Sequence, residues 1–346
     1  MGRDGYSLEH VDIEVNHRCN LACRHCSARA AKGRVPEEMS VAQIRGILSQ
    51  AQELGLRKVG LTGGEPLCDV AKLEEVATFC LEQLGVPIHM HTNGTLVTEE
   101  HCRPGGVLAL FEAVSVTFLG ATTEKHDYMT KFKGSFDRAF RGAQTCAEAG
   151  LPLSCYFIPT HGLCDGFKEL AKKLQGVGVK RIRAMALAPS GRARPIYGET
   201  APVRDELRAF ERDLLTVAER LGMQVEAGNC TRLSMPGLAV LRGHEECMSG
   251  LNRVHINSKG DVFPCTAASG VRELRLGNVR ENYVRLKDIW QRSPLLEKIR
   301  MLRGEGLPGC DECTQRPRCR HGCTVRNCGT MPESVRQRCP LVNGRR

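Results

Sequence analysis

The chain has 346 residues, 41% of them hydrophobic, and a net charge of +10, so it is long enough for roughly two or three packed domains and attracts anionic partners. It contains no run of about 18 apolar residues and no apolar N-terminal segment of signal-peptide length, so we expect a cytoplasmic protein without a membrane span. Aromatic residues make up 5%, and no basic stripe is interleaved with Phe or Tyr as in single-strand binders, so we expect no nucleic-acid partner.

The first predicted element is a short strand over residues 11–15, where apolar and acidic residues alternate with the period of a strand. A loop follows with Cys19, Cys23 and Cys26, spaced Cys-x3-Cys-x2-Cys. Because 18 cysteines in a reducing compartment indicate metal ligation rather than disulfides, these thiolates can hold three irons of a [4Fe-4S] cluster and leave the fourth iron open. A zinc site or three buried core cysteines are the alternatives.

This loop resembles the cluster loop of the radical S-adenosylmethionine (radical SAM) superfamily, and His25 matches the aromatic or imidazole residue that usually precedes the third cysteine. In that family the open iron binds S-adenosylmethionine (SAM), and reductive cleavage yields a 5'-deoxyadenosyl radical that abstracts hydrogen from substrate. The resemblance implies that Cys19, Cys23 and Cys26 are catalytic ligands and that His25 belongs to the cofactor site. It also implies a flavodoxin- or ferredoxin-type electron donor.

An amphipathic helix capped by Ser40 comes next, and a strand over 58–61 then runs into a Thr-Gly-Gly-Glu-Pro turn. Adjacent glycines let backbone approach a ligand closely, and a following carboxylate accepts hydrogen bonds from an ammonium group. An ordinary strand-to-helix turn is the alternative. The turn resembles the family's Gly-Gly-Glu-Pro motif, which binds the SAM amino group. The residues that this resemblance assigns to SAM are Gly63, Gly64, Glu65 and Pro66.

Strands and helices continue to alternate as far as residue 184. We expect helices over 70–84, 135–149 and 167–174, and strands over 87–91, 113–118, 153–158 and 179–184. This order favours a parallel α/β fold with functional loops at the carboxyl ends of the strands. It resembles the family's partial (β/α)6 TIM-like barrel, which places Asn93 and Thr117 in the cofactor site. Leu119 stands where relatives often have aspartate, and the Pro-Ser-Gly-Arg-Ala segment at 189–193 resembles a loop that lies near SAM.

A charged amphipathic helix over 202–221 predicts a bridge to a small cysteine-rich C-terminal domain. The fixed cysteine spacings of that domain again indicate metal ligation, with zinc as the alternative. They resemble the SPASM extension of radical SAM enzymes, which holds auxiliary iron-sulfur clusters, and a hairpin over 254–264 resembles it as well. The matching cysteines are Cys247, Cys265 and Cys323 for a nearer cluster, and Cys310, Cys313, Cys319 and Cys339 for a farther one.

The ligand set of the nearer auxiliary cluster is incomplete, because Arg253 stands where relatives often supply a fourth cysteine. An open iron, a non-cysteine ligand and Cys230 are the alternatives, and Cys328 is an alternative to Cys339. We therefore expect one SAM-binding [4Fe-4S] cluster and one or two auxiliary clusters. The predicted domains are a radical SAM barrel over 8–200, a bridging helix and linker over 201–246, and a SPASM domain over 247–346.

Two observations bear on the substrate. Arginines stand at loop or bridge positions that can face the cavity, and guanidinium groups bind carboxylate or phosphate bidentately, although solvated surface charges are the alternative. The first strand also begins close to Met1, which leaves no room for the N-terminal peptide-recognition domain of many peptide-modifying relatives. The arginines concerned are Arg183, Arg192, Arg194 and Arg253.

We therefore expect hydrogen abstraction from a small anionic sugar-like or nucleoside-like metabolite in natural-product, antibiotic or cofactor biosynthesis. Decarboxylation, dehydrogenation and epimerisation are all open, so the enzyme is a lyase or an oxidoreductase, and small-molecule tailoring members such as cytosylglucuronate decarboxylase resemble it in charge and size. The alternative is modification of a ribosomal peptide or protein by thioether formation, crosslinking or formylglycine-type oxidation. A non-enzymatic zinc or iron-sulfur scaffold would not need the Gly-Gly-Glu-Pro motif.

Overall fold

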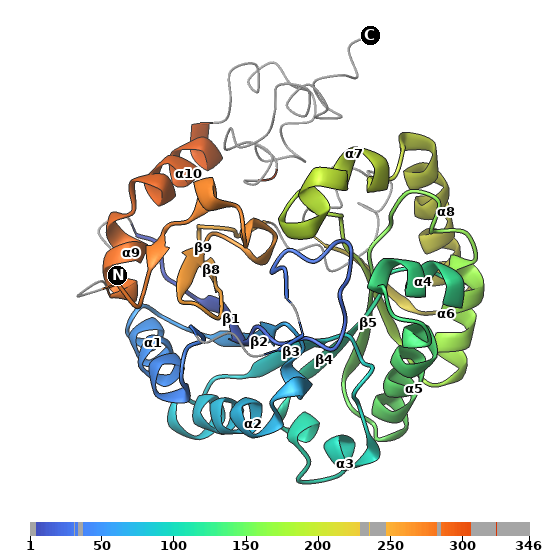
Figure 1. The fold of residues 1–346 in the computed structure, drawn as a ribbon, viewed down its shortest axis with the longest axis horizontal. Coiled ribbons are helices and arrows are strands. Elements are labelled where there is room, and N and C mark those ends of the chain that lie inside the picture. The colour runs from blue at the N-terminus through green and yellow to red at the C-terminus, as the bar shows by residue number, and fades with distance from the viewer. Residues whose placement is uncertain are drawn as a thin grey trace.

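The computed structural model describes residues 5–30, 32–33, 37–228, 235, 247–281, 285–305 and 323. In these residues the chain forms a curved ten-stranded sheet surrounded by helices on its outer face (Figure 1). The strand order is β10-β9-β8-β1-β2-β3-β4-β5-β6-β7, and every neighbouring pair from β8 to β7 is parallel. The prediction of a parallel α/β barrel is therefore confirmed.

Strands β1 to β6 alternate with helices, as the partial (β/α)6 pattern requires. The strands are β1 (His10–Asn16), β2 (Lys58–Gly63), β3 (Ile88–Thr92), β4 (Ala113–Phe118), β5 (Leu153–Phe157), β6 (Arg181–Ala184), β7 (Gln224–Ala227), β8 (Arg253–Ile256), β9 (Asp261–Phe263) and β10 (Gly277–Asn278). The helices are α1 (Val41–Glu53), α2 (Val70–Thr78), α3 (Glu99–Cys102), α4 (Thr123–Thr130), α5 (Ser135–Glu148), α6 (Phe167–Gly176), α7 (Tyr197–Thr200), α8 (Arg204–Leu221), α9 (Leu286–Arg292) and α10 (Pro294–Glu305). None of the described helices combines the length and the apolar character needed to cross a membrane.

Strand β1 shows how the barrel separates an apolar from a polar environment. Val11 and Ile13 are fully buried in the main hydrophobic core, which they share with Ile44 of α1. Asp12 and Glu14 lie on the opposite face, because side chains alternate along a strand, and they are almost fully buried as well. Parallel strands covered on both faces are usually apolar throughout, so this alternation marks a barrel with a polar interior.

Besides short helices that were not predicted, three differences from the predicted elements concern the sheet and the helix after β2. The helix expected over 70–84 ends as α2 at Thr78, and a π-helical turn continues it over Phe79–Gln83. Strand β7 falls in the stretch predicted to be a linker, and it pairs with β6. The predicted hairpin forms β8 and β9, but β8 also pairs with β1 in the register His10 to Arg253. The C-terminal hairpin therefore extends the sheet of the barrel.

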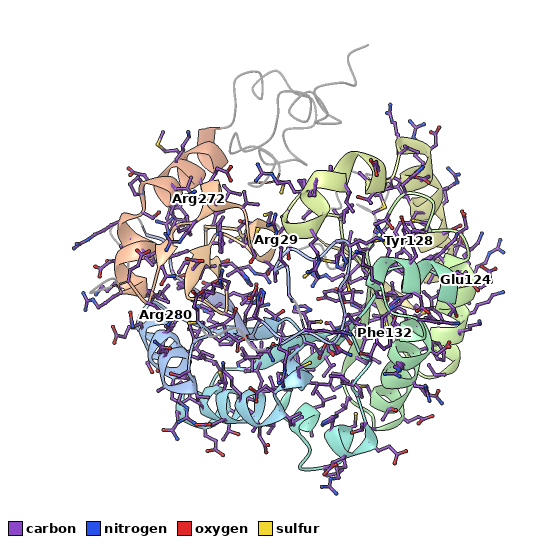
Figure 2. The ribbon with its side chains drawn as sticks, in the orientation of Figure 1. Arg29, Glu124, Tyr128, Phe132, Arg272 and Arg280 are labelled. Atoms are coloured by element: carbon purple, nitrogen blue, oxygen red, sulfur yellow. The ribbon has the colours of Figure 1, made fainter. Side chains whose placement is uncertain are left out.

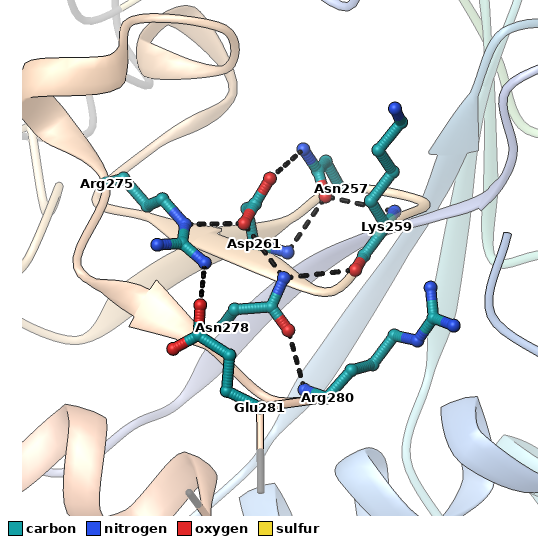
Figure 3. Close-up of polar contacts among 7 residues, drawn as sticks. All are labelled: Asn257, Lys259, Asp261, Arg275, Asn278, Arg280 and Glu281. Carbon is teal, nitrogen blue, oxygen red and sulfur yellow. Dashed lines mark hydrogen bonds and ion pairs between the residues drawn. The ribbon is translucent and has the colours of Figure 1, made fainter. Parts of the chain in front are cut away.

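A polar network fixes the free edge of this extension (Figure 3). Asp261 accepts hydrogen bonds from Nε of Arg275 at 2.5 Å, Nδ2 of Asn278 at 2.8 Å and Nδ2 of Asn257 at 3.2 Å. Although burial opposes it, these donors lower the pKa of Asp261, which keeps the carboxylate charged. Arg275 also pairs with Glu281. The network anchors β10, whose two residues make a short edge strand that gives other chains little to pair with.

Candidate functional site

The loop after β1 carries the three cysteines predicted to hold the radical cluster, and it crosses the centre of the ring of helices (Figure 1). Cys19 is buried, whereas Cys23 and Cys26 are partly buried. All three line a cavity of about 890 Å³ inside the barrel. The loops that follow β2, β3, β4 and β6 line it too, so the cavity opens at the carboxyl ends of the strands, as expected for a barrel enzyme.

Contacts with α4 hold this loop in place. The backbone N–H of Arg24 donates to the carbonyl of Met129 at 2.8 Å, and that of Ala22 donates to the carbonyl of Thr130 at 3.2 Å. The Arg24 guanidinium lies 4.2 Å from the ring centroid of Tyr128, which Figure 2 labels beside α4. An exposed cation–π contact contributes only about 0.5–1 kcal/mol, so the contact supports the position that the backbone bonds set.

Burial controls the protonation of the three thiols. It raises the pKa of Cys19 to about 12 and also raises the pKa of Cys23 and of Cys26, so a metal centre binds here with release of protons. Three thiolates on one short loop are the ligand set that an iron-sulfur cluster takes from a protein.

The loop after β6 forms hydrogen bonds with the cluster loop from the other side of the barrel. Arg192 donates from Nε to the carbonyl of Cys23 and from Nη1 to the carbonyl of Ala30, both at 2.7 Å. Its backbone N–H donates to the carbonyl of Cys26 at 2.9 Å. A Cβ atom at Gly191 would lie 2.2 Å from that same carbonyl oxygen, so only glycine allows the approach. The loop after β6 therefore packs against the cluster loop, which accepts three hydrogen bonds from Arg192.

The two glycines of the Gly-Gly-Glu-Pro turn lie at the cavity wall, and their lack of side chains is required there. Gly63 has φ of +150°, and a Cβ atom on Gly64 would lie 2.2 Å from the carbonyl oxygen of Arg18. Such a contact with backbone cannot be relieved by a rotamer change. The turn therefore packs against the start of the cluster loop with its backbone exposed to the cavity.

Glu65 is fully buried and ties this turn to the end of β3. Its carboxylate accepts hydrogen bonds from the Thr92 hydroxyl at 2.7 Å, the backbone N–H of Asn93 at 2.7 Å and the backbone N–H of Leu67 at 3.2 Å. Burial raises the pKa of Glu65 despite these donors. Neither Glu65 nor Pro66 lines the cavity, so an effect of either residue on SAM is exerted through the turn that they position.

The other predicted cofactor residues, His25, Asn93 and Thr117, all line the cavity. Asn93 donates from Nδ2 to Oδ1 of Asn20 at 2.9 Å, and the same nitrogen lies 3.8 Å from Sγ of Cys19. The Nδ1 atom of His25 is buried and has no hydrogen-bond partner in the described part of the chain. A buried polar atom of this kind is a position that a bound ligand can satisfy.

His126 also lines the cavity, although the sequence analysis gave it no place in the site. Its Nδ1 accepts a hydrogen bond from the backbone N–H of Leu119 at 3.2 Å, and burial lowers the pKa of His126 to about 4. Leu119, at the position where relatives often have aspartate, is buried and lines the cavity beside it. The His-Asp pair at 126–127 was the sequence signal that could have located this residue.

Three cysteines predicted for the nearer auxiliary cluster lie together beside the cavity. Burial raises the pKa of Cys265 to about 12, and the neighbouring thiols of Cys323 and Cys247 raise it further. The two residues that follow Cys265 line the cavity. Arg253, at the expected position of a fourth ligand, points into the barrel and binds Asp12. The other predicted ligands lie outside the described residues, namely Cys310, Cys313, Cys319 and Cys339, with the alternatives Cys230 and Cys328.

Charged side chains from opposite walls form the inner part of the cavity. Arg253 donates from Nε and Nη2 to Oδ2 of Asp12 at 2.8 and 2.7 Å. Burial by itself would raise the pKa of Asp12, but this guanidinium holds that pKa well below its usual range. Across the barrel, Arg183 donates to the Tyr156 hydroxyl at 3.3 Å and lies 3.5 Å from the Glu226 carboxylate. Of the arginines considered in the sequence, Arg194 does not line the cavity and pairs with Glu273.

A row of rings crosses the barrel between these walls. His10, His89, His91 and Tyr156 follow one another with centroid separations of 5.0, 5.5 and 5.1 Å. Burial lowers the pKa of His10 to about 4 and that of His91 to about 3, so both imidazoles are neutral at pH 7. Sequence reasoning missed these residues, although the alternation of histidines with apolar residues in β3 is the signal of a polar interior.

Comparison with known proteins assigns both cysteine-bearing regions. Residues 13–174 match the radical SAM superfamily, and residues 247–321 match SPASM, an iron-sulfur cluster-binding domain. The PqqA peptide cyclase of Rhizobium meliloti is 30% identical over 287 residues, which cover 81% of this chain and 72% of the relative. The AdoMet-dependent heme synthase of Oleidesulfovibrio alaskensis is 28% identical over 313 residues, which cover 83% of this chain and 75% of the relative.

The fold is shared with a solved structure of a radical SAM enzyme. Streptococcus suis SuiB bound to S-adenosylmethionine matches with a TM-score of 0.70 at 19% identity, covering 92% of this chain and 73% of that one. The cysteine loop lies inside the first matched region and Cys265 inside the second. The chain therefore uses SAM and [4Fe-4S] clusters, and it belongs to the radical SAM superfamily as a member with a C-terminal SPASM domain.

Proposed function

We propose that this radical SAM enzyme abstracts hydrogen from one residue of a peptide or protein substrate. The observation that carries the proposal is the relationship to PqqA peptide cyclase, at 30% identity over 81% of the chain. The sequence analysis favoured a small metabolite and gave a peptide as the alternative, whereas this relationship favours the peptide. The short segment before β1 does not argue against a peptide, because a separate partner protein can recognise it.

The cavity sets how much of the substrate enters. Its volume of about 890 Å³ falls within the range of ligand pockets, roughly 300–1,000 Å³, and it must take both SAM and the reacting group. One side chain of a peptide fits the remaining space, so we propose that the rest of the peptide stays at the mouth of the barrel. There it would meet the loops after β1 and β6.

The residues of this chain have distinct roles in the proposed reaction. Cys19, Cys23 and Cys26 hold the radical cluster, and Arg192 and Asn93 fix the loop and its first thiolate. When bound, the reduced cluster and SAM supply the 5'-deoxyadenosyl radical. We propose a flavodoxin- or ferredoxin-type reductant, with the radical chemistry in residues 8–200 and the auxiliary sites in 247–346.

A small anionic metabolite is the second candidate. The inner cavity presents Arg253 and Arg183, which suit a carboxylate or phosphate, and AdoMet-dependent heme synthase is a 28% identical relative. A decarboxylase or dehydrogenase reaction belongs to this candidate. Both candidates use the same radical site and differ in what occupies the remaining volume.

Formation of 5'-deoxyadenosine by the reduced, reconstituted enzyme separates the two candidates. Peptide and metabolite fractions of the producing cell are added with SAM, each with and without prior protease digestion, and the Cys23→Ala variant gives the background. We expect stimulation by the peptide fraction that protease abolishes. Stimulation by the metabolite fraction that survives protease would overturn the proposal in favour of the second candidate.

A further inference from the structure

Three potential metal ligands meet inside the barrel, on the wall formed by β1 and β3. Nε2 of His10 lies 3.2 Å from Oδ1 of Asp12, and Nε2 of His89 lies 3.8 Å from the same oxygen. The three ligand atoms all lie within 4.8 Å of one another. In the described part of the chain no other group of histidine, cysteine and carboxylate side chains converges in this way.

The strand register builds this group. Asp12 of β1 is the neighbour of Gly60 in β2, which is the neighbour of His89 in β3. A Cβ atom at Gly60 would lie 2.2 Å from Oδ1 of Asp12 and 2.8 Å from Nε2 of His89. The missing side chain between the two ligands therefore gives them the space to approach each other across an intervening strand.

Two of the ligand atoms are buried without a well-aligned hydrogen bond. Nε2 of His10 and Oδ1 of Asp12 lie 3.2 Å apart as an ion-pair contact, and neither atom makes an aligned hydrogen bond among the described residues. A buried polar atom without a hydrogen bond lowers the stability of the fold. A cation between them would satisfy both at once. The other carboxylate oxygen, Oδ2, is bound by Arg253 and Thr266, so Oδ1 is the oxygen left for a ligand.

The distances and the donor types agree with one class of ion. Metal–ligand bonds of about 2.0–2.1 Å in a tetrahedral site put ligand atoms about 3.3–3.4 Å apart. The two distances from Asp12 to the histidines, 3.2 and 3.8 Å, bracket that value, and all three ligand atoms lie within 4.8 Å, so a small inward movement of the side chains completes the geometry. Two imidazoles and one carboxylate suit zinc or ferrous iron rather than calcium or magnesium. We propose that His10, Asp12 and His89 form a second metal site, separate from the iron-sulfur clusters, which binds a divalent transition-metal ion.

The site has a position left for a ligand from the cavity. His10, His89 and Arg253 all line the cavity, so an ion held by the three side chains faces the space that takes the substrate. Asp12 supplies the one negative charge among the three ligands of a divalent ion, so an anionic group of the substrate suits the remaining coordination position. The ion then orients that group, as metal ions do when they act as templates. Arg253 is a positioning residue that fixes the carboxylate.

Metal content of the anaerobically reconstituted holoenzyme tests the proposal without knowledge of the substrate. Enzyme with its clusters loaded is dialysed against Zn²⁺, and zinc and iron per chain are measured together. We expect one zinc per chain above the cluster iron. The His10→Ala/His89→Ala double variant loses this zinc at unchanged iron content, and unchanged iron also reports that the variant is folded.

Gly60→Ala provides a test in which every ligand is kept. The added methyl pushes Asp12 and His89 apart, so we expect zinc affinity to fall about tenfold or more, as it does when the support of metal ligands is disturbed. Gly46→Ala is the matched control, because Gly46 lies on the exposed face of α1 with nothing within 4 Å of the added methyl. Zinc retained by the double variant, or no zinc bound by the wild type with its clusters full, would overturn the proposal.

Discussion

Nε of Arg192 donates to the carbonyl of Cys23 at 2.7 Å, and this bond joins the loop after the sixth barrel strand to the loop after the first. The two strands lie at opposite ends of the six-stranded barrel, with four strands between them. Across this distance the guanidinium links the cluster loop to the far wall. The position of the radical cluster therefore depends on a residue that lies 169 positions after Cys23 in the sequence.

Arg192→Gln is expected to weaken cluster binding. The variant cannot donate to both Cys23 and Ala30, and a hydrogen bond from a charged group contributes about 1.5–3 kcal/mol. Iron per chain and the rate of SAM cleavage should both fall after anaerobic reconstitution. Arg194→Gln is the control, because Arg194 lies on the same loop, half exposed, and pairs with Glu273. Equal iron content in Arg192→Gln and the control would contradict the role of Arg192.

Cys23→Ala and Cys265→Ala are expected to separate the two kinds of cluster. Removal of Cys23 takes one ligand from the radical cluster, so formation of 5'-deoxyadenosine should be abolished while auxiliary iron is retained. Removal of Cys265 should lower the iron content of the nearer auxiliary site and leave reductive SAM cleavage measurable. Iron analysis and product quantification on both variants check the assignment, which fails if Cys23→Ala still forms 5'-deoxyadenosine.

Gly64→Ala is expected to be more damaging than an alanine substitution elsewhere on the surface. The methyl would lie 2.2 Å from the carbonyl oxygen of Arg18, and overpacking against backbone costs about 1–3 kcal/mol or more. SAM affinity should fall because the turn must withdraw from the cavity. Gly198→Ala, with nothing within 4 Å of the new atom, is the comparison. Equilibrium binding of SAM that is the same in both variants would rule out the close approach.

His126 is expected to make stability depend on pH. Its pKa of about 4 in the fold lies below the value of about 6.5 in the unfolded chain, so the unfolded chain takes up the proton first as pH falls. The contribution is fully present above about pH 6.5 and is lost as pH falls toward 4, which amounts to about 2 kcal/mol between pH 7 and pH 5. The neighbouring Asp127 opposes the shift without cancelling it.

Urea unfolding under anaerobic conditions at these two pH values measures the effect. The free energy of unfolding should change less with pH in His126→Gln than in the wild type, because glutamine can still accept the bond from Leu119 but does not titrate. An identical pH dependence in the two proteins would show that protonation of His126 is not coupled to unfolding.

Local patterns in the sequence predicted the barrel well. The strands at 113–118 and 58–61 and the helix beginning at Ser135 match the structure closely, because each has a strong period and a clear turn at its ends. Strand β7, Gln224–Ala227, escaped prediction because Val225 is its only large apolar residue, so the stretch shows no apolar pattern. The pairing of β8 with β1 depends on a contact between residues 241 apart, for which no local signal exists.

The residues of the candidate site also divide into those that local sequence patterns predict and those that they do not. Cysteine spacing and the glycine turn predicted the loops that surround the cavity, since motifs of that kind are local. The convergence of Asp12, Gly60 and His89 could not be predicted, because it follows from the register of three strands. The role of Arg192 was missed for a similar reason. The sequence alone does not show that its guanidinium donates to the carbonyl of Cys23, so the residue was considered as a ligand of the substrate.

The pairing of β1 with β8 also constrains how the protein is made. β1 leaves the ribosome first, yet one of its edges stays unpaired until the partner strand, more than two hundred residues later, has been synthesised. An unpaired strand edge is a template for association with other chains, and slow, non-local pairing prolongs that exposure. During translation Asp12 has no ion pair with Arg253 until that residue is synthesised, so the nascent barrel carries an unneutralised carboxylate in its interior. Completion of the C-terminal hairpin is therefore the step that both seals the barrel edge and neutralises its charge, which makes the last third of the chain a determinant of soluble expression.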